Sequence, residues 1–198
     1  VKSFATETIY FKAKDGLEVA ADLYVIHPKT APFIVLFHQA NWSRGEYKEI
    51  APKLNSLGYN CMAVDLRSGA TINDVQNITK QNAVKGMKQT SYINSLPDME
   101  AAIQYANKNF VEGKLVIWGS SYSAALSIKL AGDSLQPVDA ILAFSPGEYF
   151  ASQGKPRDYI TSGAITIDKP IFITSAKGEK NAWWGIYVAI PSERKTFY

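Results

Sequence analysis

The chain has 198 residues, of which 46% are hydrophobic and 20% charged, and its formal net charge is +3. This length suits one domain with a sizeable core, and the composition is that of an ordinary globular protein. The charge is too small, and the basic residues are too scattered, to indicate a nucleic-acid partner. No apolar run approaches the ~18 residues that a membrane-spanning helix needs.

Cysteine content and the first residue bear on the compartment. Cys61 is the only cysteine, which excludes an intramolecular disulfide and a cysteine-rich metal site. It lies in an apolar, strand-like run, so we expect a buried and unreactive thiol. The sequence begins at Val1 rather than at methionine and carries no visible signal peptide. Removal of a leader or a tag would explain this start, which slightly favours a processed secreted or periplasmic protein over a cytoplasmic one.

The first elements are strands. Two strand-like runs, 6–14 and 17–26, are joined by Asp15-Gly16, a strong signal for a β-hairpin. The continuous apolar run Phe33–Phe37 is typical of a strand inside a covered parallel sheet.

A helix is expected next, capped by Ser43 and ended by Gly58, with Pro52 kinking it. Segment 67–94 is polar, basic and without clear periodicity. Its length predicts a lid or insertion that would favour anionic substrates, and a plain solvated face is the alternative. The other expected elements are a strand at 61–65, a helix starting at Pro97, a helix at 122–132, strands at 138–144 and 171–174, a helix at 183–190 and the opening of a last strand at 195–198.

This order predicts an α/β protein with a mainly parallel sheet, an N-terminal antiparallel hairpin and helices on both faces. In such sheets the ligand site lies beyond the carboxyl ends of the strands.

One such strand end carries the pentad Gly119-Ser120-Ser121-Tyr122-Ser123, between an apolar run and helix-forming residues. A small-x-Ser-x-small pentad is the nucleophile-elbow pattern, in which small residues flank a strained serine. Ser121 fits the central position, whereas Ser120 would place Tyr122 at a crowded one. The helix N-terminus at Ser121 favours an oxyanion. A loop with an ordinary N-cap serine is the alternative.

Four segments, taken in order, resemble the α/β-hydrolase superfamily, and more narrowly the dienelactone-hydrolase-like esterases. They are the strand that ends at His38, the run 60–67, the pentad and the run 169–179. The resemblance implies that residues 1–198 form one α/β-hydrolase domain and that no metal or organic cofactor takes part.

In that family a serine is activated by a histidine that an acid orients. The resemblance makes Ser121 the nucleophile, with the N–H of Tyr122 as one oxyanion donor. Ala40 is expected to supply the second donor and Gln39 is the alternative. Gln39 also departs from the family pattern, because a glycine usually follows the histidine.

The resemblance places the acid at Glu179, where the family usually has aspartate, with Glu148 as the alternative acid. A solvated loop charge is the other interpretation of Glu179. The family histidine follows the last strand, yet the sequence holds only His27 and His38. We therefore expect the C-terminal strand–loop–helix with this histidine to be missing from residues 1–198, which would leave apolar sheet surface exposed. His38 is the remaining alternative as base.

Aromatic side chains are expected near the site. His38, Trp42 and Trp183 are candidates for the pocket wall, whereas Trp118 at a strand end is assigned to the core. The expected function is that of a serine hydrolase acting on a small carboxylic ester or related acyl compound. The alternatives are a non-catalytic protein that binds a ligand or partner in the same cleft, and an acyltransferase. The sequence does not determine the oligomeric state.

Overall fold

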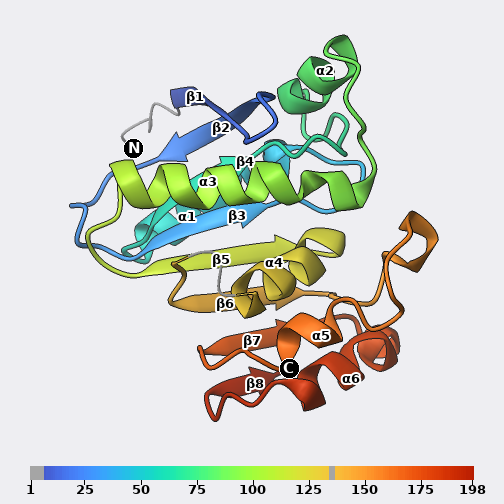
Figure 1. Ribbon diagram of the computed structural model, residues 1–198. Coiled ribbons are helices and arrows are strands. Elements are labelled where there is room, and N and C mark those ends of the chain that lie inside the picture. The colour runs from blue at the N-terminus through green and yellow to red at the C-terminus, as the bar shows by residue number, and fades with distance from the viewer. Residues whose placement is uncertain (1–6, 134–136) are drawn as a thin grey trace.

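The computed structural model describes residues 7–133 and 137–198, so Thr6, the first residue of the predicted hairpin, lies outside the described residues. One eight-stranded sheet runs through the molecule in the order β1-β2-β4-β3-β5-β6-β7-β8 (Figure 1). Strands β3 to β8 run parallel to one another, and β2 is antiparallel to both of its neighbours, β1 and β4. The predicted mainly parallel sheet with its N-terminal hairpin is confirmed. The strands are β1 (Glu7–Lys12), β2 (Glu18–Tyr24), β3 (Phe33–Phe37), β4 (Asn60–Val64), β5 (Leu115–Ser120), β6 (Ala140–Phe144), β7 (Ile171–Thr174) and β8 (Lys195–Phe197).

Helices cover the two faces of the sheet unequally. The larger core joins one face to residues of α3, α4, α5 and α6, of which α3, α4 and α5 lie in front of the sheet in Figure 1. On the other face, the buried helix residues that join the core are Ala51 of α1 and Tyr47 of the 3-10 helix η1. The α-helices are α1 (Ile50–Ser56), α2 (Ile78–Lys85), α3 (Leu96–Asn109), α4 (Tyr122–Gly132), α5 (Thr161–Ala164) and α6 (Lys180–Ala189). The 3-10 helices are η1 (Arg44–Tyr47), η2 (Tyr92–Ser95), η3 (Ala151–Gln153) and η4 (Lys177–Glu179).

The α1 face carries an aromatic row that is only half-buried. Trp118 of β5 stacks on Phe144 of β6 with ring centroids 4.4 Å apart, and Phe144 meets Phe172 of β7 edge-on. Tyr47 packs edge-on against Trp118 from the other side. Trp118 therefore belongs to the sheet face, and part of that face remains open to solvent in the described residues.

The structure corrects the prediction of one kinked helix after Ser43. Ser43 does cap a helix, because its Oγ accepts a hydrogen bond from the Gly45 N–H, but the helix is the short η1. A separate helix, α1, begins at Ile50, so Pro52 lies in its first turn. First-turn N–H groups have no intrahelical partner, and proline is therefore tolerated there without a kink.

Segment 67–94 contains structure that its weak periodicity did not reveal. It includes α2, which Asn77 caps by accepting a hydrogen bond from the Lys80 N–H. The buried Thr79 Oγ1 accepts a hydrogen bond of 2.9 Å from the Ala20 N–H, so α2 is anchored to β2. The part of the chain that the structure describes contains no helix long and apolar enough to cross a membrane.

Candidate active site

The predicted site residues follow strands that end at the same edge of the sheet. Connections leave β3 on one face through α1 and arrive at β5 on the other through α3, so the strand order reverses between β3 and β5. In open α/β sheets, ligands bind beyond the carboxyl ends of the strands at such a point. The register pairs Phe37 with Gly119, Ser120 with Phe144, and Phe144 with Thr174. The segments that follow these four strands therefore emerge side by side.

Ser121 stands between β5 and α4 with φ of 58° and ψ of −121°. A non-glycine residue in such a conformation carries about 1–3 kcal/mol of backbone strain, which persists only where the surroundings enforce it. The Ser121 N–H donates to the Phe144 carbonyl at 2.7 Å, which ties the turn to β6. The Ser121 hydroxyl is half-buried and makes no hydrogen bond within the described residues.

The other small residues of the pentad are explained by close packing and by a buried network. A Cβ on Gly119 would lie 2.5 Å from the backbone of Ala124, so any side chain there would push α4 away. The fully buried Ser123 hydroxyl accepts a hydrogen bond from the Ser120 N–H at 2.9 Å and lies 2.8 Å from the Phe37 carbonyl oxygen. Residues 119–123, called here the Ser121 turn, are thus joined to the end of β3.

A second turn, residues 38–42, follows β3 and is called here the His38 turn. His38 is fully buried, and its Nδ1 lies 2.7 Å from the Gln39 carbonyl oxygen. Its Nε2 accepts a hydrogen bond of 2.9 Å from the Leu66 N–H, so the ring is neutral. Burial lowers the pKa of His38 to about 4. Asn77 reinforces the turn by donating to the Trp42 carbonyl at 3.1 Å.

Two backbone N–H groups of the His38 turn, those of Gln39 and Ala40, were predicted as alternatives for the second oxyanion donor. The Gln39 N–H donates to Glu46 Oε2 at 2.7 Å, so it is already engaged. The Ala40 N–H, by contrast, donates no hydrogen bond to any described residue. Tyr122 is the first residue of α4, and its N–H also has no intrahelical partner. Of the predicted oxyanion donors, Ala40 and Tyr122 are therefore open, one on each turn.

Glu179 lies in η4, after β7, and its Oε2 accepts a hydrogen bond of 2.7 Å from the Ser145 hydroxyl. Ser145 follows β6 with a left-handed φ of 53°. Because Ser121 is bonded to Phe144, the residue before Ser145, Glu179 belongs to the same strand-end cluster as Ser121. Tyr149 completes this corner by donating from its hydroxyl to the Ser145 carbonyl at 2.8 Å. Sequence reasoning missed Ser145 and Tyr149, although their position after β6 was a signal.

The alternative acid, Glu148, is engaged elsewhere. Its carboxylate accepts hydrogen bonds from the N–H groups of Ile160 and Thr161, at 2.9 and 2.7 Å, and from the Thr161 hydroxyl. These contacts hold the start of α5. A carboxylate with three local donors has a structural role that accounts for it.

Neither histidine of the sequence is placed to take a proton from Ser121. His27 follows β2, and its Nε2 lies 2.7 Å from the Asn55 carbonyl oxygen. Its own N–H bonds to Asn60, the first residue of β4, so His27 lies at the amino edge of the parallel strands. His38 lies at the correct edge, but both of its ring nitrogens are engaged.

The aromatic candidates lie in different surroundings. Trp183 is almost fully buried, donates from Nε1 to Ser175 Oγ at 2.8 Å and borders a cavity of 280 Å³ together with Lys180 and Phe197. Trp42 is half-buried. His38 is wholly enclosed, so it does not form an accessible pocket wall.

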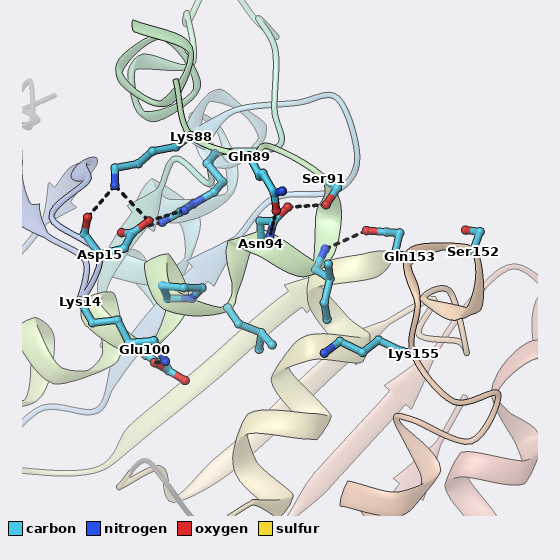
Figure 2. A pocket seen from close by; sticks show the side chains of 14 residues that line it. Lys14, Asp15, Lys88, Gln89, Ser91, Asn94, Glu100, Ser152, Gln153 and Lys155 are labelled. Atoms are coloured by element: carbon cyan, nitrogen blue, oxygen red, sulfur yellow. Dashed lines mark hydrogen bonds and ion pairs between the residues drawn. The ribbon is translucent and has the colours of Figure 1, made fainter. Parts of the chain in front are cut away.

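A cavity of about 830 Å³ lies elsewhere (Figure 2). Segments 88–97, 152–155 and the β1–β2 hairpin line it, and Ser121 and Glu179 do not. Its charges mostly pair with one another: Arg67 binds Asp15 and Asp98, Lys88 lies 3.5 Å from Asp15, and Lys14 binds Glu100. The basic residues Arg67 and Lys88 of segment 67–94 therefore face the hairpin.

Within residues 7–133 and 137–198, no group of three or more histidine, cysteine, aspartate or glutamate side chains is arranged to hold a metal ion.

Known proteins give a fold match without a sequence match. No protein-family model matches the sequence, and no curated protein matches it. An esterase of Pyrococcus furiosus matches with a TM-score of 0.72 at 14% identity, over 98% of this chain and 81% of its own. A dienelactone hydrolase from Anabaena variabilis ATCC 29413 gives 0.74 at 12% identity, over 97% and 83%. A highly thermostable carboxyl esterase from Bacillus coagulans gives 0.71 at 10%, over 99% and 90%.

Structural similarity at 10–14% sequence identity establishes the fold alone. The chemistry has to be argued from the residues of the site. The sheet order, the antiparallel hairpin and these structural matches together confirm the predicted resemblance. The chain has an α/β-hydrolase fold of the dienelactone-hydrolase-like kind.

Proposed function

We propose that the protein is a serine hydrolase that cleaves a small carboxylic ester or related acyl compound through an acyl-enzyme on Ser121. The observation that carries this proposal is the strained backbone of Ser121 between β5 and α4, with open N–H groups of Tyr122 and Ala40 on the adjoining turns. A structural serine needs no such strain, whereas a nucleophile must project its hydroxyl toward a substrate. The esterase and dienelactone hydrolase folds around it agree with this chemistry.

In the proposed reaction, Ser121 Oγ attacks the acyl carbon while a base takes its proton. The carbonyl oxygen becomes an oxyanion held by the N–H groups of Tyr122 and Ala40. Each such donor contributes ~3–4 kcal/mol to stabilisation of the transition state. Collapse expels the alcohol, which receives the proton from the base, and water then hydrolyses the acyl-enzyme by the same route. Glu179 is proposed to orient the base.

The base is proposed to be a histidine that residues 1–198 do not place beside Ser121. His27 is at the wrong edge of the sheet, and His38 is a buried neutral ring whose nitrogens are both engaged. The base would therefore come from additional chain of the same protein or from a partner.

Chemical rescue tests this proposal directly. Residues 1–198 alone should hydrolyse short p-nitrophenyl esters slowly, and added imidazole should raise the rate by replacing the absent base. The rate measured with Ser121→Ala at the same imidazole concentrations is subtracted, because imidazole itself reacts with the ester. A parent protein that carries the histidine should be active without imidazole. Equal rates for the wild-type chain and Ser121→Ala under all conditions would instead favour a non-catalytic ligand-binding protein.

A further inference from the structure

We propose that Glu46 is a positioning residue that fixes the His38 turn, so that the N–H group of Ala40 converges with that of Tyr122 on one oxygen atom. This inference rests on the proposed function, because it assigns a role within the proposed oxyanion hole. It concerns a residue that the sequence did not single out.

Glu46 binds the backbone of the His38 turn. Its Oε2 accepts a hydrogen bond of 2.7 Å from the Gln39 N–H. Gln39 directly precedes Ala40. The carboxylate thus fixes the residue immediately before the proposed Ala40 donor.

The short helix η1 fixes Glu46 itself. On one side, the Tyr47 hydroxyl donates to the Phe37 carbonyl at 2.7 Å. On the other side, the Arg44 N–H and Nη1 donate to the two oxygens of Asp65, at 2.8 and 2.6 Å. Because η1 is tied in this way to the ends of β3 and β4, Glu46 holds the Gln39 N–H from a fixed position.

The charge of Glu46 is not compensated by a cation. Glu46 takes part in none of the ion pairs among the described residues, although this residue is half-buried. Of the titratable groups on the elements packed against it, Asp65 is paired with Arg44, His38 is neutral, and the pKa of Tyr47 is raised well above its usual value by burial. Burial raises the pKa of Glu46 to about 7. A half-buried carboxylate held only by neutral donors is costly, and a glutamine could make a similar contact to Gln39, so stability alone does not account for it.

Kinetics separate positioning from a purely structural role. Glu46→Ala removes the link, so kcat for a p-nitrophenyl ester should fall about tenfold to a hundredfold, the usual effect of a small misplacement, with KM nearly unchanged. Glu46→Gln keeps an acceptor for the Gln39 N–H and should restore most of kcat. Glu49→Ala, at an exposed glutamate outside η1, is the matched control and should match the wild type. Wild-type kcat in Glu46→Ala, or equal loss in Glu46→Ala and Glu46→Gln, would overturn the proposal.

Phosphorus NMR of a phosphonylated protein supplies the second readout. A fluorophosphonate places its phosphoryl oxygen where the oxyanion would form, so the shift reports the N–H groups around it. We expect different shifts in the wild type and Glu46→Ala, and a pH-dependent step near the pKa of Glu46 that Glu46→Gln lacks. An adduct on Ser121 with identical shifts and identical pH profiles in all variants overturns the role of Glu46 alone. Failure of any adduct to form on Ser121 overturns the proposed function and this inference together.

Discussion

The Ser123 hydroxyl lies 2.8 Å from the carbonyl oxygen of Phe37, and this contact joins the turn after β5 to the end of β3. The same carbonyl accepts the Tyr47 hydroxyl at 2.7 Å. The backbone that holds Ser121 is therefore fastened to the strand that precedes the His38 turn. Small size alone, the reason for expecting Ser123 at its place in the pentad, does not account for these contacts.

Removing this hydroxyl should destabilise the protein. Ser123→Ala leaves the Ser120 N–H without its acceptor, which should cost about 1–3 kcal/mol in the free energy of unfolding. Ser127 is the matched control, because it is fully buried on the same helix and its Oγ has no partner among the described residues. Ser127→Ala should be neutral or stabilising. Urea unfolding of both variants measures the difference, and equal effects would mean that the Ser123 contacts contribute nothing.

Two glycines offer a similar contrast. Gly119→Ala would bring a Cβ to 2.5 Å from the Ala124 backbone, so it should lower the melting temperature and displace Ser121. Gly185 is exposed within α6, and an added Cβ there meets no atom within 4 Å. Gly185→Ala should stabilise by about 0.5–1 kcal/mol, because alanine is the better helix former. Thermal unfolding of the pair is the measurement. A Gly119→Ala variant with unchanged melting temperature and activity would show that α4 does not need this close approach.

The two candidate acids should separate into one that acts in catalysis and one that acts in stability. In a parent protein that carries the histidine, Glu179→Gln should lower kcat by orders of magnitude while folding is unchanged, because an orienting acid would be lost. Glu148→Gln should lower stability, because a neutral side chain holds the donors at Ile160 and Thr161 less strongly. Ester hydrolysis and unfolding are measured for both variants. The reverse outcome, with kcat lost only in Glu148→Gln, would assign the acid to the loop after β6.

Glu46 should also make stability depend on pH. Its pKa is raised from 4.5 to about 7 in the folded protein, so the folded state binds more protons than the unfolded state between these values. The free energy of unfolding therefore falls as pH rises through this window, by at most about 3 kcal/mol. Glu46→Gln lacks this loss, so its stability relative to the wild type should increase from pH 4.5 to 7 and then level off. Titration of His38 and Asp65 occurs in both proteins and cancels in the difference. A difference that does not vary with pH would show that Glu46 is not perturbed.

The sequence predicted most of what local pattern determines. The run Phe33–Phe37 and the helix at 122–132 have the predicted bounds, because apolar continuity and helix-forming residues specify them locally. The predicted order of strands also led to the correct sheet edge for Ser121 and Glu179.

Other features depend on contacts that are distant in sequence. Glu46 gains its contact with the Gln39 N–H only when the strand ends meet, so no local pattern marked it. α2 was missed because only Thr79 and Ala83 of this helix are buried, and two such residues make no apolar stripe. Pro52 was misread because the break between η1 and α1 shifted the helix start to Ile50.

The central claim is that Ser121, and no neighbouring hydroxyl, is the nucleophile. The most direct measurement is fluorophosphonate labelling of the protein, with mass-spectrometric mapping of the modified residue, in the wild type, Ser121→Ala and Ser120→Ala. The account predicts a single adduct on Ser121, abolished in Ser121→Ala and retained in Ser120→Ala. An adduct on Ser120, or equal labelling of the wild type and Ser121→Ala, would contradict it.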